Sequence, residues 1–543
     1  MHPLIEQLWP EIILIAGAAL ILLLGLVRAL GRRAMFLALT FVGGAMIAAY
    51  SLARAQADVG ITAVSELQTG PLVWYARLVT LSVGALILLA NRHVPREGER
   101  GEFFALILVS LAGISLVAMA NDLVLLFLAL ELVSIPTYIL IGLSRRDIRA
   151  QEATGKYFFL GAFAAALTLY GFSFLYGVAG TTRMFAGGPG DGSLHAALTI
   201  PTAMRDSFVI IGLVLALAGL AFKIAAVPLH FYAADVYQGA AAPVAGLLGF
   251  VPKFAGFLAI IRILSLCDWS FAPQHVGTPD ALFWLLWVLA AATMFVGNTL
   301  ALWQHNVKRL LAYSSIAHSG YMLVALVAGP GVPRTVENGP LRGGVTAVLF
   351  YIAVYGVMNL GAFAALSFFR KAAPDDPDDS VEMLDDLAGA ARRHPWATLA
   401  LTVCVLGLMG FPLTAGFLGK LYVFSAALAA ASAPAAAPLA GDASTSTYTA
   451  MLVLVVIGVL NSAIAAAYYL RILAACYLRK PADGVSPSRC LMLRLSMALC
   501  ALIVLGLFFK PDIVFNKCQA AAQPVALTGH ISDAGHATAA AQP

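Results

Sequence analysis

Charged residues are scarce in this chain of 543 residues, because lysine, arginine, aspartate and glutamate together make up only 11% of it. A soluble globular domain holds about 25% charged residues. The chain is instead 61% hydrophobic, with a mean hydropathy of +0.88. Apolar runs close to the length of a bilayer-spanning helix recur along it. The composition therefore argues against a string of soluble domains and predicts one bundle of membrane helices.

Motifs that hold cofactors, metals or nucleic acids are also missing. The six cysteines are scattered, and none forms the CxxC pair typical of zinc and iron–sulfur sites. The sequence has no GxGxxG after a strand, no P-loop and no HExxH. Its net charge of +5 is modest and no basic block suits nucleic acid. We therefore expect no metal, nucleotide, nucleic acid or redox cofactor to bind this chain.

Fourteen apolar stretches have the length of transmembrane helices. The sequence thus predicts an all-α polytopic membrane protein with spans near 11–29, 34–54, 72–91, 103–120, 122–143, 154–179, 208–230, 240–265, 280–303, 306–329, 344–370, 395–427, 450–478 and 490–509. Lysine and arginine gather in the loops after spans one, three, five, nine, eleven and thirteen. By the positive-inside rule, both termini lie on the non-cytoplasmic side of a bacterial inner membrane. The N-terminal run lacks the features of a cleaved signal peptide.

Two groups of five spans follow one another in this pattern. Because five is an odd number, the second group must be inverted relative to the first, an arrangement typical of transporters. We therefore divide the chain into helices 1–3 (1–100), a first repeat (101–268), a second repeat (269–480), helix 14 (481–510) and a disordered tail (511–543). The Ala/Pro/Ser-rich stretch 429–447 is predicted to be an outer loop.

A carboxylate, Glu131, stands in the middle of the predicted span NDLVLLFLALELVSIPTYIL. Hydrocarbon does not solvate an anion, so this group must pair, become protonated or face water. Pro136 follows within two turns and frees a backbone carbonyl near Leu132. A structural ion pair between helices is one interpretation. We favour a role in proton transfer.

Lys223 lies in LAGLAFKIAAVPLH, where Pro228 deprives the carbonyl of Ile224 of its helical partner. Broken helices are tolerated at membrane depth only beside protein or water-lined cavities. A lysine there can load and release a proton as a carboxylate approaches or retreats, whereas snorkelling to the interface is the alternative. His230, about two turns later, is either a second relay group or an ordinary polar residue.

Two further lysines share a span with a helix breaker. Lys253 directly follows Pro252, and Lys420 lies after Pro412 in CVLGLMGFPLTAGFLGKLYVF. Two neighbouring cations would repel each other, which favours a stepwise relay over permanent charges. Three lysines beside helix breaks in one chain are hard to ascribe to structure alone.

His318, in LLAYSSIAHSGYMLVAL, is a candidate link between the two later lysines. Small polar residues around it also hold membrane helices together, so a structural role is the alternative. Lys308 and Arg309 lie at the predicted cytoplasmic end of the same span. We expect these two cations to set topology and not to move protons.

Three segments resemble the antiporter-like membrane subunits of respiratory complex I: KIAAVPLHFYAADVYQGAAAPVAG, GNTLALWQHNVKRLLAYSSIAHSGYMLVAL and GFPLTAGFLGKLYVF. The DVYQGA-x-APV pattern is similar to the branch called subunit N of NADH–quinone oxidoreductase, and the resemblance covers roughly residues 100–480. It implies that Glu131 and Lys223 form a carboxylate–lysine pair, with Lys253 as connecting and Lys420 as terminal lysine. It also implies a proton-pumping subunit beside other membrane subunits of the complex, whose partners hold FMN, iron–sulfur clusters and quinone.

Three other functions fit the sequence less well. A Mrp-type cation/proton antiporter subunit would use similar lysines, but sodium prefers oxygen ligands and Glu131 is the one confident intramembrane carboxylate. A structural scaffold without a transport path leaves the three lysines unexplained. Quinone reduction within this chain is not expected, since no cofactor ligands are present. We therefore predict enzymatic action only as a subunit of an H⁺-translocating NADH:quinone oxidoreductase.

Overall fold

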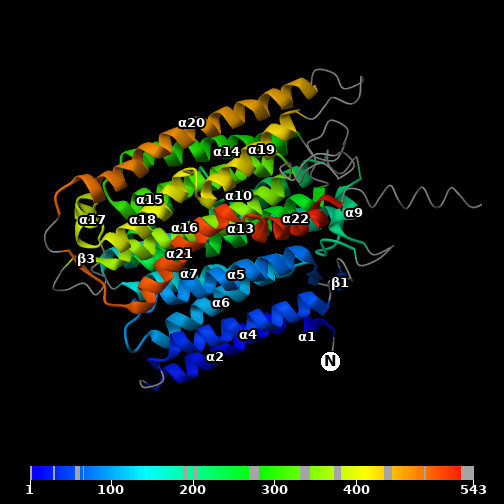
Figure 1. Cartoon of the computed structure of the whole chain (residues 1–543). Helices are drawn as coiled ribbons and strands as arrows, with labels where there is room; N and C mark the ends of the chain where they lie inside the picture. Colours follow the sequence, from blue (N-terminus) through cyan, green and yellow to red (C-terminus); the bar gives the residue numbers. More distant parts are fainter. Residues whose placement is uncertain are drawn as a thin grey trace, which may run out of the picture.

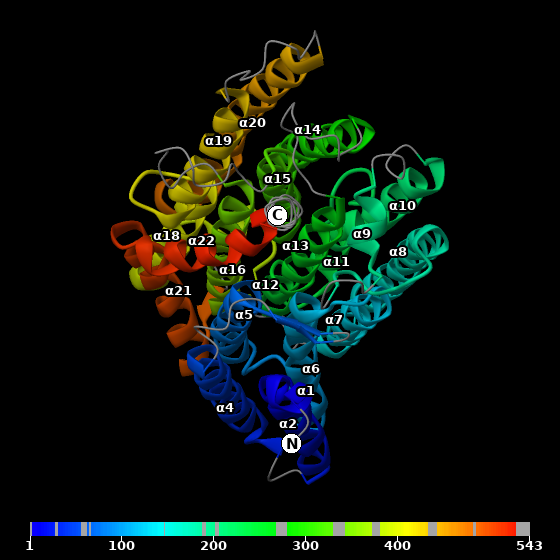
Figure 2. The ribbon, with the colours of Figure 1, turned by 90° about the vertical axis from the view of Figure 1, so that its right-hand side faces the viewer.

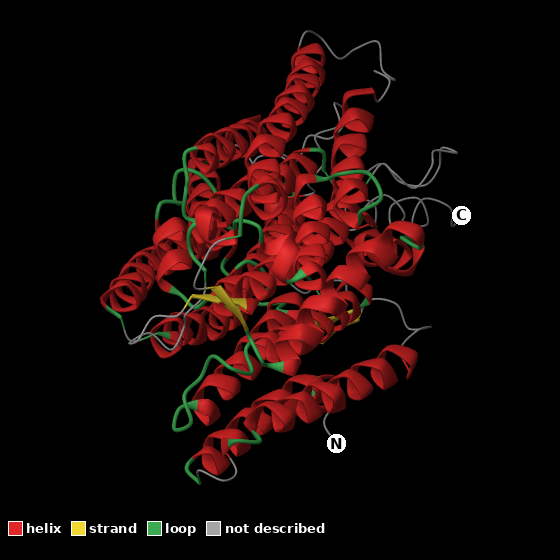
Figure 3. Ribbon diagram, turned by 60° about the vertical axis from the view of Figure 1, so that its left-hand side comes forward, coloured by secondary structure: helices red, strands yellow, loops and turns green. Residues whose placement is uncertain are grey.

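Long apolar runs become helices because a membrane offers the backbone no water, so each segment must bond its own N–H and C=O groups. A computed structural model describes residues 3–27, 31–55, 62–64, 67–145, 147–186, 192–200, 206–267, 280–329, 343–371, 381–432, 443–481 and 485–527. The described chain is a bundle of long helices with two short pairs of strands (Figure 1, Figure 3). The element β3 and helix α17 mark one end of the bundle, and β1 and α9 mark the other (Figure 1).

The N-terminal helices form one side of the bundle (Figure 1). They are α1 (Pro3–Gln7), α2 (Trp9–Gly25), α4 (Ala34–Ala55) and α5 (Pro71–Ala90), with the antiparallel strands β1 (Thr62–Val64) and β2 (Leu67–Thr69) before α5. A buried ion pair that the sequence analysis did not single out joins α2 to α5. Both nitrogens Nε and Nη2 of Arg77 donate to the carboxylate of Glu11, at 2.8 and 2.7 Å.

The next group of elements carries the first of the predicted repeats. It comprises α6 (Arg100–Met119), α7 (Leu123–Ser144), α8 (Ile148–Ala179), α9 (Leu194–Leu198), α10 (Ser207–Lys223), α11 (Tyr232–Gly239), α12 (Ala242–Leu248), α13 (Val251–Leu264) and the 3₁₀ turn η2 (Ser265–Cys267). The predicted span 208–230 ends early, because α10 stops at Lys223 and the chain resumes a helix only at Tyr232.

The second group begins with α14 (Asp280–Leu302), α15 (Val307–Val327) and α16 (Gly344–Phe368). It continues through β3 (Phe369–Lys371), η3 (Leu384–Leu387), α17 (Ala390–Arg393), α18 (Pro395–Met409), α19 (Ala415–Ser432) and α20 (Ala443–Leu478). Strand β4 (Val485–Pro487) pairs antiparallel with β3, and α21 (Leu491–Phe509) and α22 (Asp512–Leu527) follow. The predicted outer loop 429–447 is shorter than expected, because α19 and α20 extend into it; residues 433–442 lie outside the described residues.

Two helix breaks occupy corresponding places in the two groups, between α10 and α11 and between α18 and α19. Each break holds a residue other than glycine in the left-handed region, Ala225 with a φ of 55° and Leu413 with a φ of 74°. Such a conformation costs about 1–3 kcal/mol and persists only where the surroundings enforce it. The packing around both breaks must therefore hold the chain in an irregular path.

The centre of the bundle consists of helices buried on every side. All described side chains of α13 and α16 are buried, and both helices lie inside the ring of the others when the bundle is viewed end on (Figure 2). Outer helices instead present large apolar side chains outward; Ile47 of α4 is 73% exposed and Leu23 of α2 is 65% exposed. Exposed apolar surface on this scale indicates contact with lipid or partner chains.

The all-α membrane fold is confirmed. Each predicted span overlaps at least one helix, and eleven helices of the described chain are long and apolar enough to cross a membrane. Four shorter apolar helices complete the bundle: Trp9–Gly25, Ser207–Lys223, Pro395–Met409 and Ala415–Ala430. The number of crossings, the inversion of the second group and the side on which the termini lie stay predictions.

The predicted disordered tail needs a correction, because α22 occupies its first half. Phe515, Cys518 and Ala522 recur at helical spacing and are 5%, 0% and 4% exposed. They form the apolar face that packs against α5 and α16. The alanine- and glutamine-rich composition concealed this stripe. Residues 528–543 lie outside the described residues.

Candidate functional site

The first break brings Glu131 and Lys223 together. The Nζ of Lys223 lies 3.0 Å from Oε1 of Glu131 and also donates to the hydroxyl of Ser134, one turn further along α7. The Lys223 side chain is 5% exposed and that of Glu131 is 21% exposed. Lys223 is the last residue of α10, where the negative end of the helix dipole favours a cation.

Pro228 leaves the carbonyl of Ile224 without a hydrogen-bond partner in its own helix. This carbonyl instead accepts a hydrogen bond from another helix. The hydroxyl of Ser319 on α15 donates to this oxygen at 2.6 Å. Ser319 belongs to the second group of helices and Ile224 to the first. The carbonyl freed at the break beside Lys223 therefore accepts its hydrogen bond from a side chain in the opposite half of the molecule.

Lys253 lies on α13 and is only 2% exposed. Its Nζ donates to the carbonyl of Ser315 at 2.5 Å and to the hydroxyl of Ser319 at 2.8 Å. The same Ser319 hydroxyl thus accepts a bond from Lys253 and donates one to Ile224, the residue next to Lys223. One serine connects the environments of the two lysines.

The backbones around these lysines approach each other closely at Gly256. A Cβ at this position would lie 2.8 Å from Cγ2 of Ile224 and 3.1 Å from Cβ of Lys223. A side chain on Gly256 would therefore push α13 away from the break. A helix break before Lys253 is predicted from Pro252, and the structure has one there, between the end of α12 at Leu248 and the start of α13.

His318 lies on α15 and is 1% exposed. Its Nδ1 is 2.7 Å from the hydroxyl of Tyr351, and its Nε2 is 3.0 Å from the hydroxyl of Tyr469. In a neutral imidazole one nitrogen donates and the other accepts. The two tyrosine hydroxyls can satisfy either tautomer, so a proton can leave one nitrogen while the other is protonated.

Lys420 lies on α19 and is 6% exposed. Its Nζ donates at 2.9 Å to the carbonyl of Met409, the last residue of α18, and lies 4.8 Å from the centre of the Tyr321 ring. The Lys420 ammonium therefore caps the helix that ends at the second break. Lys223 terminates the helix at the first break, so both lysines place their charge at the C-terminal end of a half-helix.

Two aromatic rings fill the spaces beside His318. The Tyr355 ring lies 4.9 Å from the imidazole and 5.8 Å from the ammonium of Lys253. The Tyr321 ring, which lies under Lys420, is 5.9 Å from the imidazole. Tyr355 thus lies beside both Lys253 and His318, and Tyr321 lies beside both His318 and Lys420, so the three groups form one series joined by aromatic rings.

His230 does not join this series in the described chain. It lies in the loop after the first break, half-buried, and its Nδ1 contacts the carbonyl of Pro228 at 3.2 Å. The helix resumes only at Tyr232, so His230 lies in the irregular segment and not on one continuous helix with Lys223; a relay role for His230 stays a prediction. The broken segment turns the imidazole toward its own loop.

Some of the hydroxyl groups that join the charged residues were not predicted from the sequence. Ser134 and Ser319, and the tyrosines around His318, were not singled out. For Ser319 a signal existed, because it follows Ser315 by four residues and so lies on the same face of α15. Within the described residues, no group of three or more histidine, cysteine, aspartate or glutamate side chains is arranged to hold a metal ion.

Comparison with known proteins gives consistent matches. The family described as NADH:quinone oxidoreductase/Mrp antiporter, TM, matches residues 120–440. NADH-quinone oxidoreductase subunit N of Trichlorobacter lovleyi is 38% identical over 408 residues, which are 75% of this chain and 74% of that protein. Subunit N 1 of Solibacter usitatus is 37% identical over 498 residues, covering 90% and 91% of the two chains.

One solved structure extends the likeness to nearly the full length. A chain of respiratory complex I from Thermus thermophilus with bound aureothin is 30% identical to this chain and superposes on it with a TM-score of 0.71. The match covers 94% of this chain and 99% of that one.

Proposed function

The chain belongs to the NADH:quinone oxidoreductase/Mrp antiporter family of membrane proteins, and from that membership we propose that it is a proton-translocating membrane subunit of an NADH:quinone oxidoreductase. The names of its curated relatives support the oxidoreductase over the antiporter. The observation in the molecule that carries the proposal is the Glu131–Lys223 ion pair at a helix break, linked through Ser319 to Lys253.

The proposed mechanism starts with the separation of Glu131 from Lys223 by charge movement elsewhere in the complex. An ammonium that loses its carboxylate partner, while it remains buried, releases its proton more readily. The Ser319 hydroxyl leads from the break to Lys253. His318 then passes the proton toward Lys420, which lies at the second break.

Electron transfer from NADH to quinone belongs to other subunits in this proposal. FMN and the iron–sulfur clusters would be bound there, and this chain would contribute only the proton path. Lipid and the neighbouring membrane subunits would cover its exposed apolar faces. The Glu131 carboxylate, at 21% exposure, lies close enough to the surface of the chain to respond to such a neighbour.

An Mrp-type antiporter subunit is the second candidate, since the family description names both. Sodium transport needs oxygen ligands that are free to bind the ion. Of the two carboxylates described inside the helices α2 and α7, Glu11 is bonded to Arg77 through both oxygens and Glu131 to Lys223. The series of buried lysines, without a free carboxylate in α2 or α7, therefore favours proton transport over sodium transport.

Purification of the tagged chain from its native membrane tests the proposal. We expect the chain to bring down flavin- and iron–sulfur-containing subunits with NADH:quinone oxidoreductase activity. Membranes that lack the chain should lose proton pumping driven by NADH. Recovery of the chain with antiporter subunits alone, and unchanged NADH-driven pumping without it, would contradict the assignment.

A further inference from the structure

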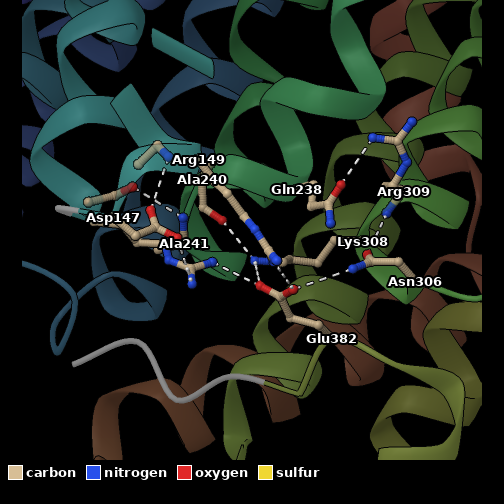
Figure 4. A network of polar contacts seen from close by, with 12 residues as sticks. Asp147, Arg149, Gln238, Ala240, Ala241, Asn306, Lys308, Arg309 and Glu382 are labelled. Atoms are coloured by element: carbon tan, nitrogen blue, oxygen red, sulfur yellow. Dashed lines mark hydrogen bonds and ion pairs between the residues drawn. The ribbon is translucent and has the colours of Figure 1, made fainter. Parts of the chain in front are cut away.

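One carboxylate outside the spans, Glu382, joins groups from separate parts of the chain (Figure 4). Its Oε1 lies 2.9 Å from Nη1 of Arg145 and 3.0 Å from Nζ of Lys308. Its Oε2 lies 3.4 Å from Nδ2 of Asn306 and 3.7 Å from Nη1 of Arg149. Arg145 and Arg149 belong to the first group of helices, whereas Asn306 and Lys308 belong to the second.

The two cations that share Oε1 are hidden from solvent. The Lys308 side chain is 0% exposed and that of Arg145 is 6% exposed, while Glu382 itself is 20% exposed. Lys308 is predicted from its place at the end of a span to set topology, but its burial and its pairing with Glu382 point to a different role. A buried cation that loses its partner destabilises the surrounding structure strongly. Arg145 has a second partner in Asp147, at 3.3 Å.

Glu382 is expected to stay ionised at neutral pH. Burial raises the pKa of its carboxyl group, but the charge of Lys308 and the hydrogen bond from Arg145 outweigh that effect, so the pKa lies below its usual value. The carboxylate is thus a fixed negative charge between two buried cations. It is poorly suited to carry protons itself, which favours a positioning role.

The backbone of Glu382 is fixed to the turn between α14 and α15. The N–H of Val307 donates to the carbonyl of Glu382 at 2.7 Å, and the N–H of Leu384 donates to the carbonyl of His305 at 3.0 Å. The side chain of Glu382 therefore extends from a rigid base in the second half. It reaches Arg145, the capping residue directly after the C-terminus of α7 in the first half.

Both helices held by Glu382 carry parts of the candidate proton path. Glu131 lies on α7 fourteen residues before Arg145, about 21 Å away at 1.5 Å per residue. Ser315 and Ser319, which bind Lys253, follow Lys308 on α15. Lys308 is also 3.1 Å from the carbonyl of Ala240, which ends α11 just before the segment that leads to Lys253.

We propose that Glu382 is a positioning residue for proton transfer between the two halves: its carboxylate locks the ends of α7 and α15 together and so keeps the Glu131–Lys223 pair in register with the Lys253 site. The inference rests on the proposed function, because it assumes that protons pass between these sites. Loss of the carboxylate would free α7 from α15 and leave Lys308 as an uncompensated buried cation.

The test compares Glu382→Gln and Glu382→Asp in the complete complex, reconstituted into vesicles. We expect Glu382→Gln to retain quinone reduction per assembled complex while its proton-to-electron ratio falls at least halfway to that of a Lys223→Ala complex. Glu382→Asp, which keeps the charge, should restore the ratio. Asp385→Asn is the matched control, since Asp385 lies three residues later in the chain and is 84% exposed in its pair with Arg479.

A second variant covers the case in which Glu382→Gln assembles poorly. Adding Lys308→Met removes the uncompensated ammonium, and Arg145 keeps Asp147. This double variant should assemble, yet its proton-to-electron ratio should remain low because α7 and α15 are still unlinked. A wild-type ratio in Glu382→Gln or in the double variant would overturn the positioning role. A wild-type ratio in Lys223→Ala would instead overturn the proposed function, so the two failures are distinguishable.

Discussion

At the scale of single residues, each buried lysine has hydrogen-bond partners among hydroxyl, carbonyl and carboxylate oxygens. Lys223 has Glu131 and Ser134, Lys253 has Ser315 and Ser319, and Lys420 has the carbonyl of Met409. The lysines are visible in the sequence because a charge inside an apolar run is conspicuous. Their partners are not, because serines, tyrosines and carbonyls are common and only the tertiary structure selects among them.

Replacing Lys420 with arginine tests whether this position needs only a positive charge or also the ability to release a proton. Arginine keeps the positive charge beside Met409 but does not give up its proton. We expect Lys420→Arg to assemble and reduce quinone, while proton pumping falls strongly, since loss of a positioned acid–base group slows proton transfer by about 10²–10⁴-fold. Pumping in vesicles checks this, with Lys371→Arg as a control at an exposed ion pair. Normal pumping by Lys420→Arg would exclude a titrating role for this residue.

Ser319 should matter more than an ordinary core serine. Ser319→Ala leaves the carbonyl of Ile224 without its partner, which costs about 1–3 kcal/mol, and removes one ligand of Lys253. We expect a lower temperature of thermal unfolding together with slower pumping. Ser173→Ala is the control, since that hydroxyl bonds only within its own helix and faces outward. A thermal shift without any change in pumping would leave Ser319 a purely structural role.

At the scale of elements, the two broken helices set the geometry of the site. Pro228 and Pro412 made both breaks predictable, and the structure has them at α10–α11 and α18–α19. The path of the chain through each break was not predictable. It depends on neighbours such as Thr293, whose hydroxyl accepts the N–H of Val227 from a different helix. This path also places His230 in the loop, where its Nδ1 contacts the carbonyl of Pro228.

Gly410 tests the geometry of the second break. It has a φ of 81°, and a Cβ there would lie 2.8 Å from Cδ of Lys420. We expect Gly410→Ala to destabilise the protein by about 1–3 kcal/mol through its backbone conformation and to displace Lys420, so that pumping falls. Gly506→Ala, where no atom would lie within 4 Å, is the control. Equal behaviour of the two variants in thermal unfolding and pumping would contradict this account.

At the scale of the whole molecule, two groups of helices meet across a buried centre formed by α13 and α16. Hydropathy was enough to predict the helical membrane fold, because the length of each apolar span is a property of the chain alone; the side of the termini, inferred from loop charge, stays a prediction. The buried pair Glu11–Arg77 and the Glu382 cluster were not predicted, since each joins residues far apart in sequence. The helix α22 was missed because its apolar stripe is made largely of alanine and cysteine.

The central claim is that proton transfer depends on the Lys223 ammonium beside Glu131. Its most direct test is the proton-to-electron ratio of a Lys223→Ala complex reconstituted into vesicles, measured during NADH oxidation. The account predicts an assembled complex that still reduces quinone but translocates fewer protons per electron than the wild type. An unaltered ratio in the Lys223→Ala complex would contradict it.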